Sequence, residues 1–228
     1  PEVALSENPE LSPLDQVLEQ ALEIERMPAA TRARYEARLE ESKVVLIRAL
    51  ISDQLRYIAV AKQYFHVQDL AEIRRRRIGT GRIGGKAAGM LLSRRMLLSG
   101  QNKFDFSQLL EAHDSFYIGS DVFFTFLVKN NLFQLRMQLT RDSQISHEEF
   151  EEVEKRFLKG QFPGDIMVQF RDMLDYFGQA PIIVRSSSLL EDRFGNAFAG
   201  KYRSEFCANQ GSPEERMQAF LHAVKLVY

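Results

Sequence analysis

The sequence predicts an α+β (α/β) protein in which an α-helical segment precedes a mixed domain of helices and strands. Apolar residues recur at helical spacing through residues 14–24 and again through residues 31–65, as in helices that bury one face. Short apolar runs at residues 115–118 and 181–184 lie between further helical segments, and such runs are typical of strands. We therefore divide the chain into a helical extension, residues 1–77, and a second domain, residues 78–228.

The composition is that of a globular protein. The chain has 228 residues, of which 45% are hydrophobic, and its formal net charge of -1 gives no argument for nucleic acid or acidic membranes as partners. No apolar stretch approaches the roughly 18 residues of a membrane span, and the N-terminus has no signal-peptide pattern. Cys207 is the only cysteine, which excludes an internal disulfide and a cysteine-based zinc cluster. We expect a reducing, cytoplasmic setting.

The helical extension has two notable parts. Residues 31–65 are expected to form a helical hairpin that packs on the following domain or on a second copy of the chain, as in a homodimer. The run of four arginines at residues 74–77 is the second part. Such runs are usually solvated faces. A nucleic-acid patch is one alternative, which no interleaved aromatic residues support, and attraction of a polyphosphate to the next loop is another.

That loop, residues 78–90, is rich in glycine. It contains a G-x-G-x-x-G pattern, but no apolar strand precedes it, which argues against a dinucleotide fingerprint. A Walker A loop would need glycine at Thr80 and serine or threonine at Ala87. The remaining pattern is a turn that feeds a helix with Lys86 near its start, where free amides favour an anion. The alternative is a turn packed tightly on another element, with Lys86 in solvent.

A second polar group follows the apolar run of residues 181–184. Arg185 and three serines, beginning with Ser186, come directly after it, and Glu191 and Asp192 follow. A second strand is expected at residues 202–207. A guanidinium group beside hydroxyls suits phosphate, because it offers aligned charged donors. The alternative is a hairpin in which Arg185 pairs with one of the two carboxylates.

The other elements of the second domain have recognisable start signals. Ser120 is a good N-cap for a helix over residues 121–128. Capping boxes of the Ser-x-x-Glu type start helices at Ser146 and Ser212, and a further helix is expected from residue 165 to about residue 177, where Gly178 stops it. The four histidines do not stand at metal-ligand spacing, so we expect no metal site from them.

Two motifs together resemble the nucleotide-binding domain of the phosphoenolpyruvate synthase and pyruvate phosphate dikinase family. Residues 84–90, G-G-K-A-A-G-M, are similar to the G-G-K-x-x-x-L loop of the family. Residues 184–200 are similar to its signature V-R-S-S-(A/S)-x-x-E-D…F-A-G. The resemblance covers about residues 78–228. It implies the first lobe of an ATP-grasp-like domain, here preceded by the helical extension.

The resemblance also implies a function. ATP lies between two lobes in this family, and a phosphoryl group passes to a histidine on a separate domain and then to pyruvate or another acceptor. Lys86 and Arg185 would contact the ATP phosphates, Gly200 would approach the nucleotide through its backbone, and Ser204 would lie near it. The predicted nucleotide site is completed by Gly84, Gly85 and Ser186.

We expect the second lobe, its Mg²⁺ ligands and the phosphohistidine domain outside this chain. The chain would then be the ATP-binding part of a phosphotransferase and would not be active alone. The alternative is a non-catalytic nucleotide-binding or regulatory module with a helical interaction segment.

Overall fold

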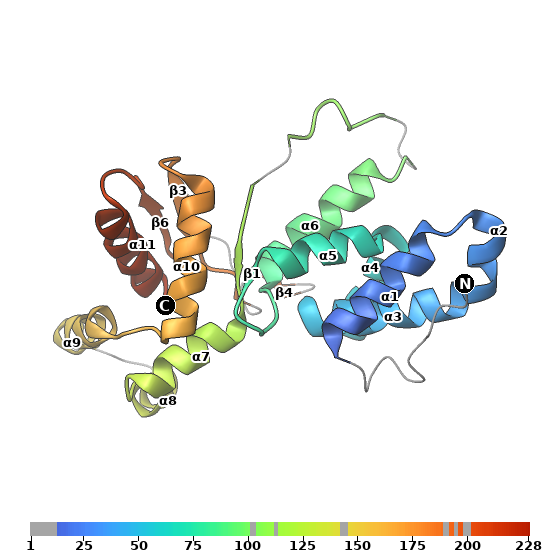
Figure 1. Ribbon diagram of the computed structural model, residues 1–228. Coiled ribbons are helices and arrows are strands. Elements are labelled where there is room, and N and C mark those ends of the chain that lie inside the picture. Colours follow the sequence, from blue (N-terminus) through green and yellow to red (C-terminus); the bar gives the residue numbers. More distant parts are fainter. Residues whose placement is uncertain are drawn as a thin grey trace. The chain divides into compact units, whose positions relative to one another are not determined.

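The computed structural model describes residues 13–100, 104–111, 114–141, 146–188, 192–193, 196–197 and 202–228. The chain folds into two compact units. The N-terminal unit takes in residues 1–77 and 81–117, and the C-terminal unit takes in residues 78–80 and 118–228. Helices predominate and the short strands pair two by two (Figure 1), which confirms the predicted α+β class.

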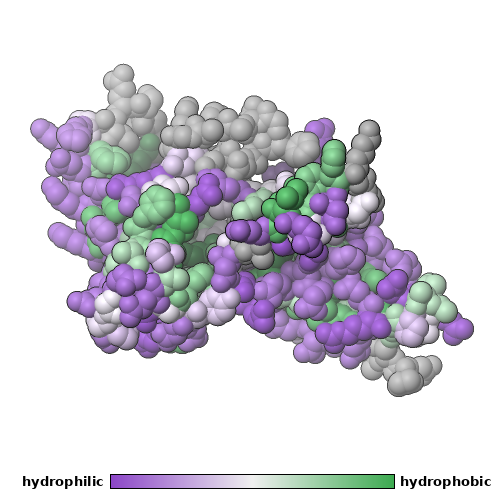
Figure 2. All heavy atoms as spheres, turned by 90° about the horizontal axis from the view of Figure 1, so that it is seen from above, coloured by the Kyte–Doolittle hydropathy of each residue, from purple (hydrophilic) through white to green (hydrophobic). Residues whose placement is uncertain are grey.

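The N-terminal unit is built mainly from helices, most of which bury residues in a shared core. These are α1 (Leu14–Arg26), α2 (Ala29–Arg32), α3 (Glu36–Leu50), α4 (Leu55–Tyr64), α5 (Val67–Arg75) and α6 (Gly85–Leu98), with a 3-10 turn η1 (Ala33–Tyr35) between α2 and α3. Helix α3 packs against α1, α4 and α5, and Leu46, Ile47 and Leu50 of α3 are fully buried. Hydrophilic side chains cover much of the visible outer face of these helices (Figure 2).

Two carboxylates fix the start of α5. Glu25 of α1 accepts hydrogen bonds from the backbone amides of Val67 at 2.8 Å and Gln68 at 3.2 Å. Asp69 accepts one from the amide of His66 at 2.9 Å. Because the first amides of a helix have no partner within it, these bonds stabilise α5 and tie it to α1.

The C-terminal unit combines five helices with short strands among its described residues. These elements are α7 (Ser120–Lys129), α8 (Phe133–Arg141), α9 (His147–Lys159), α10 (Gly164–Phe177), β3 (Ile182–Arg185), β4 (Asp192–Arg193), β5 (Asn196–Ala197), β6 (Ser204–Cys207) and α11 (Pro213–Val227). Strand β3 pairs with β6 and β4 with β5, both antiparallel. Helix α11 packs against β6, β3, α9 and α10. The chain passes between the two units in the paired strands β1 (Arg77–Ile78) and β2 (Tyr117–Ile118).

Aromatic side chains fill the core of the C-terminal unit. The ring centroids of Phe126 and Phe162 are 4.7 Å apart, those of Phe162 and Phe170 are 5.2 Å apart, and those of Phe170 and Phe220 are 5.1 Å apart. Tyr228 packs edge-on against Phe126 at 5.5 Å, and burial raises the pKa of its hydroxyl. This chain of rings joins α7, α10 and α11 into one core.

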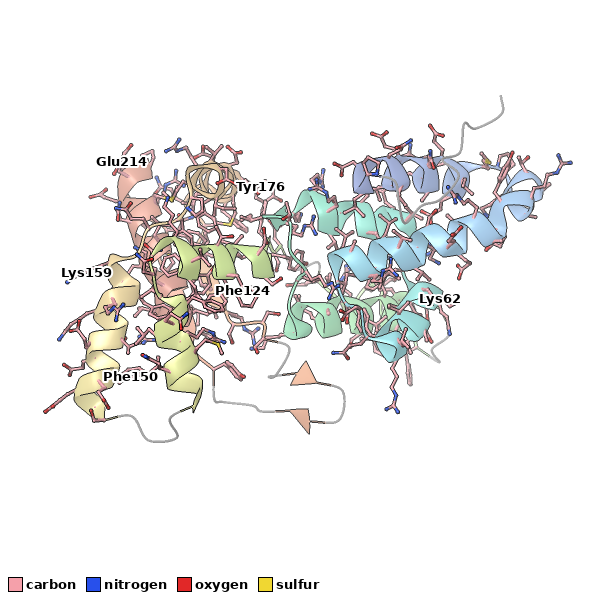
Figure 3. The ribbon with its side chains drawn as sticks, turned by 90° about the horizontal axis from the view of Figure 1, so that it is seen from below. Lys62, Phe124, Phe150, Lys159, Tyr176 and Glu214 are labelled. Carbon is pink, nitrogen blue, oxygen red and sulfur yellow. The ribbon has the colours of Figure 1, made fainter. Side chains whose placement is uncertain are left out.

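The capping boxes predicted at the starts of α9 and α11 are confirmed. The Ser146 hydroxyl accepts from the Glu149 amide at 3.2 Å, and the Ser146 amide donates to the Glu149 carboxylate at 2.9 Å. Ser212 and Glu215 make the same pair of bonds at 3.2 and 2.8 Å. Glu214 lies beside them at the start of α11 (Figure 3). Each box satisfies helix amides that would otherwise lack partners.

Two local features differ from the sequence prediction. Ser120 is the first residue of α7, and Gly119 is the N-cap residue in its place. Helix α8 was not predicted, because Asn130 and Asn131 indicate the end of a helix. Asn131 adopts a left-handed conformation with φ of 54°, so it forms a tight turn after which the chain resumes as a helix.

Candidate functional site

The G-G-K loop lies at the start of α6, as predicted. Gly84 is the N-cap residue, with an extended backbone at φ -81° and ψ 174°, and Gly85 is the first helical residue. Gly84 has no side chain that could cap the helix amides, and the first turn holds no acidic residue. Lys86 is therefore placed where the first helix amides and a positive charge come together, which favours an anion.

Contacts within the N-terminal unit hold this helix start in place. The Ile83 amide donates to the Leu50 carbonyl at the end of α3 at 3.0 Å. The Arg82 guanidinium donates to the Arg48 carbonyl at 2.9 Å and to the Asp53 carboxylate at 2.6 Å. Ala88, one turn into α6, is buried in the same core as α1, α3, α4 and α5. The end of α3 thus anchors the residues directly before the G-G-K loop.

Residues 78–80, which begin the glycine-rich loop of residues 78–90, belong to the C-terminal unit. The Gly79 amide donates to the Gln169 side chain of α10 at 2.9 Å. Thr80 donates through its amide and its hydroxyl to Asp121 of α7, at 2.8 and 3.0 Å. Gly79 has φ of 81°, and a Cβ there would lie 2.6 Å from Cγ2 of Val122. Tight packing therefore accounts for this glycine, as in the alternative interpretation of the loop.

The second predicted group lies on one face of the β3–β6 pair. Arg185 is directly opposite Ser204, and Ile183 is directly opposite Phe206. Because side chains alternate along a strand, all four lie on one face, and they are exposed. The exposed fractions of Ile183 and Phe206 are 45% and 83%. Cys207 on the other face is buried. The exposed face thus joins a guanidinium and a hydroxyl to an apolar surface.

Buried polar side chains hold the turn that leads into β3. The amide group of Asn209 donates to the carbonyls of Gly178 and Ala180, both at 2.9 Å. Arg216 of α11 donates to the Leu174 carbonyl at 3.0 Å and also to that of Gly178. These bonds satisfy carbonyls at the end of α10 and fix the point at which β3 begins.

The four consecutive arginines are engaged in contacts. Arg74 pairs with Asp15 of α1 at 3.0 Å, and Arg75 and Arg76 both pair with Glu72. Arg77 is 7% exposed and donates to the Gly81 carbonyl at 3.1 Å. The interpretation of the run as a solvated face is therefore wrong for Arg77. The carboxylates also offset the positive charge that a nucleic-acid patch would need.

The structure arranges the predicted site residues in two groups. Gly84, Gly85 and Lys86 lie at the start of α6 in the N-terminal unit. Arg185 and Ser204 face each other in the C-terminal unit, where the half-buried Ser186 directly follows β3. Gly200 lies outside the described residues, as do Glu191 and residues 198–199. Asp192 begins β4.

Comparison with known proteins identifies the family. Residues 80–228, well over half of the chain, match the family described as pyruvate phosphate dikinase, AMP/ATP-binding domain. The chain belongs to this family. The match confirms the resemblance predicted from the two motifs and makes the chain the AMP/ATP-binding part of a protein like phosphoenolpyruvate synthase or pyruvate phosphate dikinase. Searches of curated proteins and of solved structures found no match.

The boundaries of the pyruvate phosphate dikinase AMP/ATP-binding domain do not follow the compact units. The family match begins at Thr80, so it takes in α6 from the N-terminal unit and nearly all of the C-terminal unit. Helices α1 to α5 precede the match, yet α1, α3, α4 and α5 share one hydrophobic core with Ile83 and Ala88. The extension and the start of the family domain therefore fold as one unit.

Two features are absent from the part of the chain that the structure describes. Among the described residues, no group of three or more His, Cys, Asp or Glu side chains is arranged to bind a metal ion. The helices in that part of the chain include none that is long and apolar enough to cross a membrane.

Sequence reasoning missed two candidates for nucleotide contact, Ile183 and Phe206. The signal was present in the alternation of residues 182–185 and 204–207, which places both on the face of Arg185 and Ser204. An exposed aromatic ring beside a guanidinium group can contact a base or ribose while the guanidinium binds phosphate.

Proposed function

We propose that this chain supplies the first lobe of the ATP site of a dikinase-type phosphotransferase. In this proposal Lys86 and Arg185 bind the phosphates, while Ser204, Ser186 and the backbone of Gly200 line the nucleotide. Gly84 and Gly85 let the backbone approach the phosphates at the start of α6. The family match supports nucleotide binding, and the shared exposed face of Arg185 and Ser204 is the observation that carries the assignment of residues.

The proposed reaction breaks a P–O bond of ATP and transfers one phosphoryl group to a histidine nitrogen on a domain outside this chain, while the rest of the nucleotide leaves. That group then passes to an acceptor such as pyruvate. The residues of this chain position the nucleotide and offset charge on its phosphates, which is most of what phosphoryl transfer requires of a protein. Mg²⁺ would offset further charge, and its ligands are expected on the second lobe.

The proposal also covers the cellular compartment of the protein and the pairing of two copies of the chain. A reducing, cytoplasmic setting is supported by the single cysteine, which is buried as a free thiol. Pairing of two copies through residues 1–77 is supported only by the length of the helical extension.

The test compares two substitutions with matched controls in the full-length protein. We expect Lys86→Gln and Arg185→Gln each to weaken ATP binding by about 1.5–3 kcal/mol, the scale of a hydrogen bond to a charged group. Lys159→Gln and Arg171→Gln make the same changes at exposed positions of α9 and α10 and should leave ATP affinity unchanged. Figure 3 shows Lys159 at the surface. Isothermal titration calorimetry measures all five proteins.

Equal ATP affinity in the wild type and both site variants would contradict the proposed residues. Loss of ATP binding in the control variants as well would point to unfolding, which thermal denaturation of each variant detects separately. Formation of phosphoenolpyruvate from ATP and pyruvate by residues 1–228 alone would contradict the proposed need for further domains.

A non-catalytic nucleotide-binding module is the second candidate. One observation favours it: the helical extension shares its core with the start of α6. Binding at the start of α6 could then be sensed by α1 to α5 without any transfer of phosphate. The two candidates differ in product, since only the phosphotransferase consumes ATP in the presence of its acceptor.

A further inference from the structure

A pocket of about 240 Å³ lies within the N-terminal unit, apart from the residues assigned to ATP. Helices α5 and α6 and the segment at β2 provide its walls. The polar side chains that line it are Asp69, Glu72, Arg76, Arg94, Arg95 and Tyr117. Arginines are seldom gathered around a cavity without acidic partners or a ligand. The question for each guanidinium group is therefore which acceptor it contacts.

Two of the arginines are held by carboxylates. Arg95 of α6 donates to Asp69, which is itself fixed at the start of α5 by the His66 amide. Arg76 donates to Glu72 and to Asp114, and its guanidinium carbon lies 5.4 Å from the ring centroid of Phe116. These contacts fix the positions of both side chains before any ligand arrives.

Arg94 is different. Its Nε is buried, and no hydrogen-bond acceptor for it exists among the described residues. The pocket lining holds three arginines and two carboxylates, so Arg94 leaves a positive charge that a bound anion would offset. Leu91 and Ile73 supply apolar walls beside these arginines, which a water molecule would not require.

We propose that this pocket binds a small organic anion, carrying a carboxylate or phosphate group, with Arg94 as its main ligand. Arg76 and Arg95 add positive charge, and the apolar walls accept a short carbon skeleton. The volume lies below the roughly 300–1,000 Å³ of sites for drug-sized ligands, so the ligand is a small metabolite. Guanidinium groups suit both anions, because their paired N–H donors match two oxygens.

The pocket is separate from the nucleotide site along α6. Lys86 is at the first turn, and Arg94 follows about 12 Å further along the helix at 1.5 Å per residue. Half of the wall comes from residues that precede the family match, including Asp69 and Glu72. The anion therefore bridges the helical extension and the family domain, and its binding stabilises their shared packing.

The test titrates the full-length protein with inorganic phosphate and, separately, with malonate as a dicarboxylate. We expect at least one of these probes to bind, and the preferred probe identifies the anion class. Arg94→Gln should weaken that binding about tenfold or more, the effect of losing a hydrogen bond to a charged group. Arg56→Gln makes the same change at an exposed position of α4 and should have no effect.

Two more variants separate this pocket from the ATP site and from unfolding. Arg185→Gln should leave binding of the probe unchanged, and loss of binding in this variant would assign the anion to the nucleotide site and overturn the proposal. Leu91→Trp fills the cavity and keeps every arginine, so it should also abolish binding. Failure of both probes to bind the wild type, or unchanged binding in Arg94→Gln, would overturn the proposal.

Discussion

The Tyr57 hydroxyl of α4 donates a hydrogen bond of 3.0 Å to the carbonyl of Ala88, one turn into α6. Burial raises the pKa of Tyr57, so its proton stays in place at neutral pH. The bond joins the helical extension to the helix that carries Lys86. It therefore offers a direct way to test whether the two regions depend on each other.

We expect Tyr57→Phe to lower the free energy of unfolding of the N-terminal unit by about 1 kcal/mol, the usual net value of one hydrogen bond. Urea denaturation, followed by circular dichroism, measures the change. Tyr64→Phe at the end of the same helix is the control, since the described residues offer its hydroxyl no partner. A variant as stable as the wild type would show that the bond contributes nothing.

The two glycines at positions 79 and 89 should respond in opposite ways to alanine. Gly79→Ala should destabilise the protein by about 2 kcal/mol, because a positive φ strains alanine and its Cβ would lie 2.6 Å from Val122. Gly89→Ala should stabilise it by about 0.5–1 kcal/mol, because this residue lies inside α6 and a Cβ there meets no atom within 4 Å. Thermal unfolding compares both variants, and shifts of the same sign would contradict this account.

Phe206→Ala should separate base recognition from phosphate recognition. If the ring contacts the adenine, its removal should weaken ATP binding by about 1–3 kcal/mol, the value of base stacking on an aromatic residue. Affinity for inorganic triphosphate should not change, since Arg185 and Lys86 remain.

Stability should also be retained in Phe206→Ala, because this side chain is 83% exposed. Leu55→Ala, a similar loss at an 82% exposed position, is the control and should leave ATP affinity unchanged. Equal ATP affinity in Phe206→Ala and the wild type would remove Phe206 from the site.

The capping box of α11 predicts a pH dependence of stability. The hydrogen bond from the Ser212 amide holds the pKa of Glu215 below its ordinary value. The folded state therefore favours the carboxylate, and this contribution is complete above the ordinary pKa. It is lost as the pH falls through the lower pKa of the folded protein.

The comparison of wild type with Glu215→Gln measures this contribution. Their difference in melting temperature should be present near about pH 7 and should shrink as the pH falls below the ordinary glutamate pKa of about 4.3 towards the lowered pKa of the folded protein. A difference that stays constant across this range would show that the charge of Glu215 has no part in the cap.

Local sequence was sufficient to predict features that depend on near neighbours. The boxes at Ser146 and Ser212 are four-residue patterns, and their bonds form within one turn. The G-G-K loop and the strand that ends at Arg185 could likewise be predicted, because glycine, serine and apolar runs favour particular local conformations.

Features that depend on residues far apart in the sequence could not be predicted from it. The partners of Arg74 and Arg76, Asp15 and Asp114, lie far away in the sequence, so the arginine run looked like a solvated face. The pocket around Arg94 exists only because α5 packs beside α6. The pairing of Phe206 with Ile183 depends on strand register, which no single segment contains.

The burial of Cys207 has a practical consequence. It is the only cysteine of the chain, it is 4% exposed, and it lies in β6 opposite Ile182. A thiol reagent can therefore reach it only when β6 separates from the core. This chain thus carries a chemical reporter at one position, and the rate of its labelling measures how often the strand that holds Ser204 opens.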